Sequence, residues 1–212
     1  MSRTAPPASL LPAERRRYHV VALAAWVLLG HAAESPAGGL DIVAAARRQV
    51  GVTVIYDGTY QPLDYPGGDV PIERGVCTDV VVRALRAARG MDLQKLVHED
   101  MRANAAVYAN RRGRGSTAPD ASIDHRRVPN LMAYFRHAGL AQPLTHEAAD
   151  YLPGDLVAWD LGGGVLHIGL VSDRKAVTGV PLVIHNIGAG AREENILFRY
   201  AIIGHYRLEA PR

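Results

Sequence analysis

The chain has 212 residues, and its 24 Lys and Arg against 21 Asp and Glu give a formal net charge of +3. Nothing in this balance indicates a nucleic-acid protein, because no basic stripe interleaved with aromatic residues is present. We therefore expect no nucleic-acid partner.

The first 37 residues have the three parts of a secretory signal. Residues 15–17 (RRR) are basic, residues 20–30 (VVALAAWVLLG) are apolar, and the small residues Ala32, Ala33 and Ala37 follow. The apolar run is too short for a comfortable transmembrane span. We expect an exported bacterial protein, periplasmic or secreted, with no stable membrane span after signal cleavage. An uncleaved N-terminal anchor is the alternative.

Removal of this segment leaves a single domain at residues 38–212. Residues 1–37 hold four Arg and two Glu, a net charge of +2, so the remaining part carries +1 of the total +3. Its length of about 175 residues is enough for one well-buried domain and too short for two.

The first half of this domain has helical patterns. Asp41 can cap a helix that ends at Gly51, and apolar residues at a 3.6-residue period run from Cys77 to Gly90. A further helix is predicted after Asp92, and another from Pro129, which suits a first helical turn, to Gly139. Residues 110–122 (NRRGRGSTAPDAS) predict a long surface loop, either a solvated connector or a flap that contacts an anionic polymer.

After residue 153 the pattern changes to short apolar strands separated by Gly, Pro, Asp or Lys. Strands are predicted at residues 156–159, 166–172, 181–185 and 201–207. Helices followed by a strand meander predict an α+β domain with an antiparallel sheet.

Cys77 is the one cysteine of the chain, so it has no partner for an intramolecular disulfide. Its predicted place is the N-terminus of a helix, where the helix dipole favours a thiolate. A lone cysteine that leads an apolar helix is also often a small buried hydrophobic residue. Cys77 is therefore either a reactive group or a bystander in the core.

A thiol hydrolase needs an imidazole as a base and a third polar group that fixes the tautomer of this imidazole. His167 lies on one predicted strand, and the next strand ends with His185 and Asn186. Adjacent strand residues point to opposite faces, so at most one of these two can orient His167. We expect His185, with Asn186 as the alternative. Each histidine taken alone is more often a core or surface residue than a catalytic base.

These runs resemble the NlpC-like cell-wall cysteine peptidases, a papain-like superfamily. The residues that carry the resemblance are 154–157 (GDLV), 167–171 (HIGLV) and 184–185 (IH), with 76–80 (VCTDV) at the place of the nucleophile helix. Residues 73–81, 97–101, 123–130 and 185–188 resemble, more narrowly, an exported bacterial family known mainly as a domain of unknown function and grouped with these peptidases.

The resemblance implies a papain-like α+β fold in which the nucleophile at a helix N-terminus packs on an antiparallel sheet. It also implies Cys77 as nucleophile, His167 as base and His185 as orienting residue, with no cofactor and no metal. Tyr56 stands near the place of a tyrosine that this superfamily uses, although Tyr60 and Tyr65 compete for the role.

The chain departs from the family pattern at Asp79, which would oppose formation of a thiolate unless Arg74 or Arg83 offsets its charge. Asp124, His125 and Arg126 form a second charged cluster. They would either bind a substrate carboxylate, which guanidinium groups suit, or form architectural ion pairs. We count Asp79 and this cluster as possible oxyanion or substrate contacts.

Three functions compete. The first is an exported cysteine hydrolase that cleaves an amide bond in peptidoglycan peptides through a thioester, with the wall or its fragments as partner and an inhibitory or immunity protein as an open question. The second is a zinc-dependent wall peptidase or amidase that assembles its site from His125, His167, His185 or His205 with Asp124, although no H-E-x-x-H motif occurs. The third is a catalytically inactive cell-wall-binding module.

Overall fold

A computed structural model describes residue 1, residues 37–109 and residues 118–208. The predicted signal at residues 2–36 and most of the predicted loop at residues 110–122 lie outside these ranges. The described elements belong to the unit Glu34–Arg212. No helix in the described part of the chain combines the length and the apolarity that crossing a bilayer requires.

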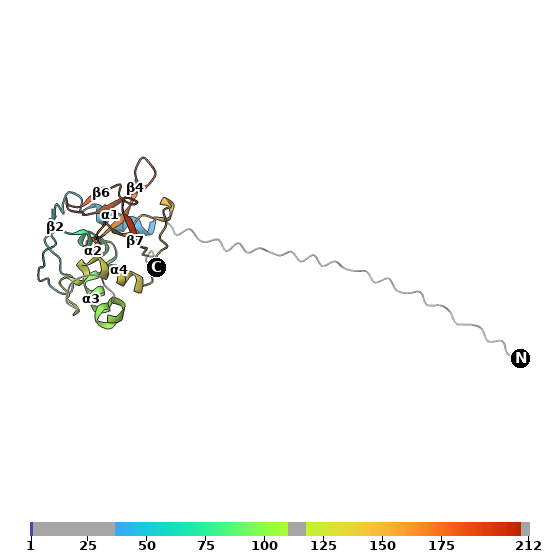
Figure 1. Cartoon of the computed structure of the whole chain (residues 1–212), viewed down its shortest axis with the longest axis horizontal. Helices are drawn as coiled ribbons and strands as arrows, with labels where there is room; N and C mark the ends of the chain where they lie inside the picture. The colour runs from blue at the N-terminus through green and yellow to red at the C-terminus, as the bar shows by residue number, and fades with distance from the viewer. Residues whose placement is uncertain (2–36, 110–117, 209–212) are drawn as a thin grey trace. The chain divides into compact units, whose positions relative to one another are not determined.

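Four α-helices make up the first half of the fold (Figure 1). They are α1 (Ala37–Arg47), α2 (Cys77–Arg89), α3 (Leu93–Ala103) and α4 (Val128–His137). Helix α2 ends at Gly90, whose φ of 61° is the left-handed conformation that closes many helices. Helix α3 begins after Asp92, whose carboxylate accepts a hydrogen bond from the backbone N–H of Gln94.

The second half is a five-stranded antiparallel sheet in the order β6-β5-β4-β3-β7. Its strands are β3 (Leu156–Asp160), β4 (Leu166–Lys175), β5 (Pro181–His185), β6 (Arg192–Glu194) and β7 (Ala201–Tyr206). A separate parallel pair joins β1 (Ile55–Tyr56) to β2 (Arg74–Gly75), just before α2.

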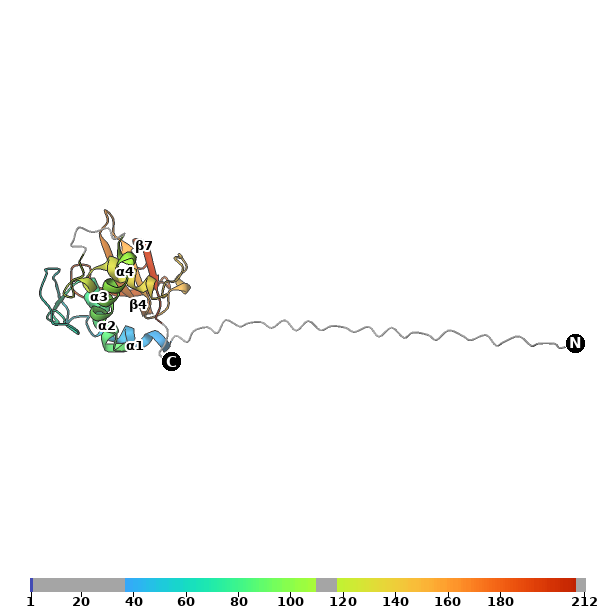
Figure 2. The same cartoon turned by 90° about the horizontal axis from the view of Figure 1, so that it is seen from below.

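The two faces of the sheet are both covered. One face, which includes Ile168 and Leu170, packs with α1, α2 and α4 in the main core. The other face, which includes Val157, Trp159 and Val183, packs with the segments before β3 and between β6 and β7 in a smaller core. Figure 2 gives the view from below, with α1, α2, α3 and α4 labelled beside β4 and β7. Both sheet faces are therefore interior, and polar side chains on them need partners.

The prediction of an α+β domain with an antiparallel sheet is confirmed. The first helix was predicted wrongly at its start: it begins at Ala37 rather than after Asp41, whose carboxylate instead pairs with Arg89. The short strands β1, β2 and β6 carried no apolar alternation, so their sequences gave no strand signal.

Candidate active site

Cys77 is the first residue of α2, as its sequence setting predicted. Gly75, two residues earlier, has a φ of 156°, and a Cβ atom there would lie 3.0 Å from the Cβ of Asp79. Glycine at this position therefore lets the chain pass close to the first turn of the helix. The backbone N–H groups of a first helical turn have no partner within the helix and point towards this end.

The sulfur of Cys77 is buried, with 5% of the residue exposed. Burial raises the pKa of the thiol to about 11, although the backbone N–H of Ile168 acts in the opposite direction. The negative charge of Asp79 raises this pKa further. Desolvation thus opposes the thiolate that the helix N-terminus would favour.

His167 and His185 contact each other directly. His167 Nε2 lies 3.0 Å from His185 Nδ1, and the two rings meet edge to face. Trp159 stacks on the other side of His167, with the ring centroids 5.7 Å apart. This contact uses His167 Nε2, so the other ring nitrogen, Nδ1, does not contact His185.

Both imidazoles are neutral near pH 7. Burial, followed by the neighbouring His185, lowers the pKa of His167 to about 3. Burial also lowers the pKa of His185, against the opposing effect of the nearby Glu194 carboxylate. Each ring therefore carries a single proton, and the nitrogen that holds it decides which nitrogen can act as a base.

The thiol and the histidine pair lie on opposite faces of the sheet near the start of β4. The backbone N–H of Ile168, the residue that follows His167, lowers the pKa of the thiol. Side-chain alternation puts Ile168 in the main core with Cys77, whereas His167 lies with Trp159 on the other face. The first residues of β4 pair with β3, with His167 opposite Trp159, and the β4–β5 ladder begins at Leu170. In the described chain no hydrogen bond joins the sulfur to either imidazole.

Asn186 does not contact His167 but secures the segment before the cysteine. Its Nδ2 donates a hydrogen bond of 2.9 Å to the carbonyl oxygen of Gly75, and its Oδ1 accepts one from the N–H of Gly188. His185 and Asn186 thus serve opposite faces of the sheet end, and His185 is the one placed beside His167.

Tyr56 lies next to the same segment. It pairs with Gly75 in the β1–β2 ladder. Partial burial raises the pKa of its hydroxyl, and the charges of Cys77 and Asp79 add to this rise. The side chain is 47% exposed, so it stands at the surface beside the buried thiol.

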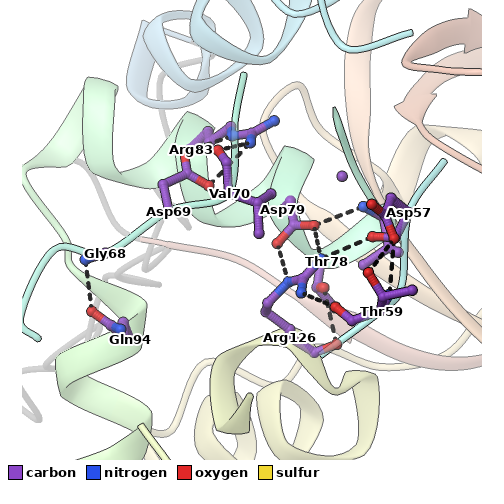
Figure 3. Close-up of polar contacts among 12 residues, drawn as sticks. Asp57, Thr59, Gly68, Asp69, Val70, Thr78, Asp79, Arg83, Gln94 and Arg126 are labelled. Atoms are coloured by element: carbon purple, nitrogen blue, oxygen red, sulfur yellow. Dashed lines mark hydrogen bonds and ion pairs between the residues drawn. The ribbon is translucent and has the colours of Figure 1, made fainter. Parts of the chain in front are cut away.

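Asp79, in the first turn of α2, forms a buried ion pair with Arg126 (Figure 3). Arg126 Nε and Nη2 donate to the two carboxylate oxygens of Asp79 at 2.9 and 3.0 Å. The same carboxylate accepts from the N–H of Val76 at 2.7 Å, which caps α2. Arg126 also donates to the carbonyl oxygens of Asp57 and Thr59. The charge of Asp79 is thus offset by Arg126 rather than by Arg74 or Arg83.

The other members of this cluster are bound within the protein. Asp124, in the short 3-10 helix η2 (Asp124–Arg126), accepts a hydrogen bond from the N–H of Asp120 and lies 3.0 Å from His98 Nδ1. His125 is buried, and burial lowers its pKa to about 4. These contacts fit the architectural interpretation of the cluster, and a substrate role stays a prediction.

The residues suggested for zinc are spread over the fold. His205 Nε2 lies 2.7 Å from Asp155, which also binds Arg207, while His125 and the His167–His185 pair occupy other places. Among the described residues, no group of three His, Cys, Asp or Glu side chains converges as a metal site requires.

Glu194 is a site residue that sequence reasoning missed. Its Oε2 lies 3.2 Å from His185 Nε2. Glu194 belongs to the short polar strand β6. This strand has no hydrophobic pattern, so its pairing register, which places Glu194 beside His185, could not be predicted from the sequence.

Two comparisons with known proteins show which family the chain is similar to. Residues 43–208 match the family model for a domain of unknown function, DUF1287. The chain is also 54% identical over 168 residues to the uncharacterized protein YijF of Escherichia coli (strain K12), which covers 79% of this chain and 80% of that protein.

Proposed function

The chain belongs to the DUF1287 family, and we propose that it is an exported cysteine hydrolase that cleaves an amide bond in peptidoglycan peptides. The observation that carries this proposal is the contact of His167 with His185 at 3.0 Å, next to Ile168, whose backbone N–H lowers the pKa of the Cys77 thiol. A papain-like, NlpC-like fold is part of the proposal, supported by the helix-borne cysteine and the strand-borne histidines.

The proposed reaction begins from a neutral pair. As the sulfur of Cys77 attacks the amide carbonyl carbon, its proton passes to His167 Nδ1, the nitrogen that His185 leaves free. The tetrahedral intermediate collapses to a thioester when the C–N bond breaks, and the imidazolium returns the proton to the leaving amine. Water then attacks the thioester with His167 again as base, which releases the acid and restores the thiol.

The start of α2 supplies electrostatic support for this chemistry. The backbone N–H groups of Cys77 and Thr78 lower the pKa of the thiol, against the larger effect of burial. Donors in this position are suited to an oxyanion that develops on a carbonyl bound to the sulfur. The Tyr56 hydroxyl is proposed as a further donor.

Cys77 and His167 lie on opposite faces of the sheet in the resting protein. The proposed reaction therefore requires the imidazole of His167 to move to the thiol at the start of β4. The closed resting arrangement, with a thiol of raised pKa, supports activation by bound substrate rather than a preformed thiolate. The wall as substrate and export as destination rest on the predicted signal and on the resemblance to NlpC-like peptidases.

Digestion of purified peptidoglycan by the exported protein tests the proposal. We expect new free amino groups together with soluble peptide fragments identified by mass spectrometry, and we expect Cys77→Ala and His167→Ala to abolish their release. Cys77→Ser is a closely matched control because it keeps the size of the side chain. Cleavage that persists in Cys77→Ala would overturn the proposal, and cleavage lost only with a chelator would favour a metallopeptidase.

A non-catalytic wall-binding module is the second candidate. The observation that favours it is the burial of Cys77, since a fully buried thiol with a raised pKa is typical of a core residue. Sedimentation with peptidoglycan separates the two functions. Binding without any release of fragments, unchanged in Cys77→Ala, would support the binding module.

A further inference from the structure

Three side chains on neighbouring strands form a row across the face of the sheet that carries Trp159. His167 lies on β4, His185 on β5 and Glu194 on β6. Glu194 pairs with Val183 in the ladder, so its side chain shares a face with His185 two residues further on. The contacts along the row are 3.0 Å between the imidazoles and 3.2 Å from His185 to the carboxylate.

His185 Nε2, the ring nitrogen that faces Glu194, needs a hydrogen-bond partner that the Glu194 carboxylate can supply. His185 is completely buried, and its Nε2 has no partner with full hydrogen-bond geometry in the described part of the chain. The side chain of Glu194 is 38% exposed, so it can turn towards this nitrogen without disturbing the core. Arg192 Nη1 lies 3.8 Å from the other carboxylate oxygen of Glu194 and keeps the carboxylate near the row.

We propose that Glu194 is a positioning residue that fixes the tautomers of His185 and His167 and leaves His167 Nδ1 unprotonated. The inference rests on the proposed function, because it assigns Nδ1 as the base for Cys77. Glu194 touches neither the thiol nor a reacting atom.

The order of protons follows from the donors and acceptors. An ionised carboxylate only accepts hydrogen bonds, so the proton of His185 resides on Nε2, and His185 Nδ1 becomes an acceptor. The proton of His167 then resides on Nε2 and donates to His185 Nδ1 across the 3.0 Å contact. The opposite order would turn a lone pair of His185 towards the negative charge of Glu194. Because burial keeps both rings neutral, each has one proton to place.

Nuclear magnetic resonance of the exported protein labelled with ¹⁵N-histidine tests the order directly. Ring-nitrogen shifts distinguish the two tautomers, and spectra of His167→Gln and His185→Gln assign the signals. We expect protonated Nε2 in both rings of the wild type. In Glu194→Gln, which removes the charge and keeps the shape, we expect both rings to become tautomer mixtures. Glu194→Asp should retain most of the wild-type pattern.

Glu147→Gln is the matched control, because it removes the charge of an exposed glutamate in the loop before the 3-10 helix η3 (Ala148–Asp150). For an active enzyme, Glu194→Gln should lower kcat at least tenfold with KM unchanged, with partial recovery in Glu194→Asp. Wild-type tautomers that persist in Glu194→Gln would overturn the inference. If no wall fragment is released even by the wild type, the hydrolase proposal fails, and the tautomer spectra still decide the role of Glu194.

Discussion

Asn186 holds the carbonyl oxygen of Gly75 from 111 residues further along the chain, through a hydrogen bond of 2.9 Å. This bond ties the end of β5 to the segment that leads into α2. The strand that ends with His185 is therefore fastened to the backbone two residues before Cys77.

Loss of this bond should destabilise the fold. Asn186 is completely buried, so Asn186→Ala leaves the Gly75 carbonyl without its donor, at a cost of about 1–3 kcal/mol in the free energy of unfolding. Asn186→Asp should cost at least as much, because it turns a donor into a negative acceptor. Urea denaturation measures both, with Asn195→Ala at an exposed position as control. An Asn186→Ala variant as stable as the wild type would contradict the anchoring role.

The Asp79–Arg126 pair predicts a strong and asymmetric effect of mutation. Arg126→Ala leaves a buried carboxylate without its partner and should lower the free energy of unfolding by about 3–5 kcal/mol. A double-mutant cycle with Asp79→Asn should recover part of this loss. The control is Arg174→Ala, whose side chain is 63% exposed in its pair with Glu193 and should cost at most about 1 kcal/mol. Additive effects of the two buried mutations would refute the coupling.

Most of the fold could be predicted because its long elements carry strong local signals. The 3.6-residue period of α2, the cap at Asp92 and the apolar strands β3, β4, β5 and β7 each agree with their tertiary environment. Residues before Asp41 gave no helix signal, yet helix α1 includes them because it packs against α2 and the sheet. Tertiary contacts there outweigh local propensity.

The candidate site was harder to predict, because its charges act across the fold. Strand alternation indicated only that one of His185 and Asn186 could orient His167, and the contact of His185 with His167 comes from the structure. The raised pKa of Cys77 depends on how completely the sulfur is desolvated, and no sequence pattern reports this. The partner of Asp79 came from η2, 47 residues away, whereas sequence proximity suggested Arg74 or Arg83.

The thiol should be slow to react in the folded protein. Its pKa of about 11 against an ordinary value near 8.5 leaves about 240-fold less thiolate near pH 8 than in the unfolded chain. We expect iodoacetamide alkylation, followed by mass spectrometry, to speed up with pH towards a midpoint near 11. The urea-unfolded protein, with the same single thiol, should have a midpoint near 8.5. A midpoint below 8.5 in the folded protein would show an activated thiolate and contradict the neutral resting pair.

Acidification should destabilise the fold through its buried histidines. His125 and His167 have folded-state pKa values of about 4 and about 3, below the unfolded value of about 6.5. The unfolded chain therefore binds protons first as pH falls below 6.5. Each histidine then removes about 1.4 kcal/mol of stability per pH unit until its folded-state pKa is reached.

Denaturation curves between pH 7 and pH 4 measure this slope. His125→Gln should flatten it by removing one titrating group, whereas His146→Gln, at an exposed position, should leave it unchanged. Equal slopes in the wild type and in His125→Gln would contradict the assignment of a neutral buried His125.

Tyr56 tests whether the surface beside the thiol takes part in the proposed reaction. Tyr56 pairs with Gly75, two residues before α2, and its hydroxyl is affected by Cys77 and Asp79, so we propose it as a donor to the oxyanion. Tyr56→Phe removes only this hydroxyl and should lower kcat on wall fragments about 100-fold, with the free energy of unfolding within about 0.5 kcal/mol of the wild type. Tyr60→Phe is the matched control, since Tyr60 is 57% exposed and competes for the same role in the sequence. A loss of activity confined to Tyr60→Phe would transfer the role to Tyr60, and unchanged activity in both variants would leave the oxyanion to the backbone N–H groups of α2 alone.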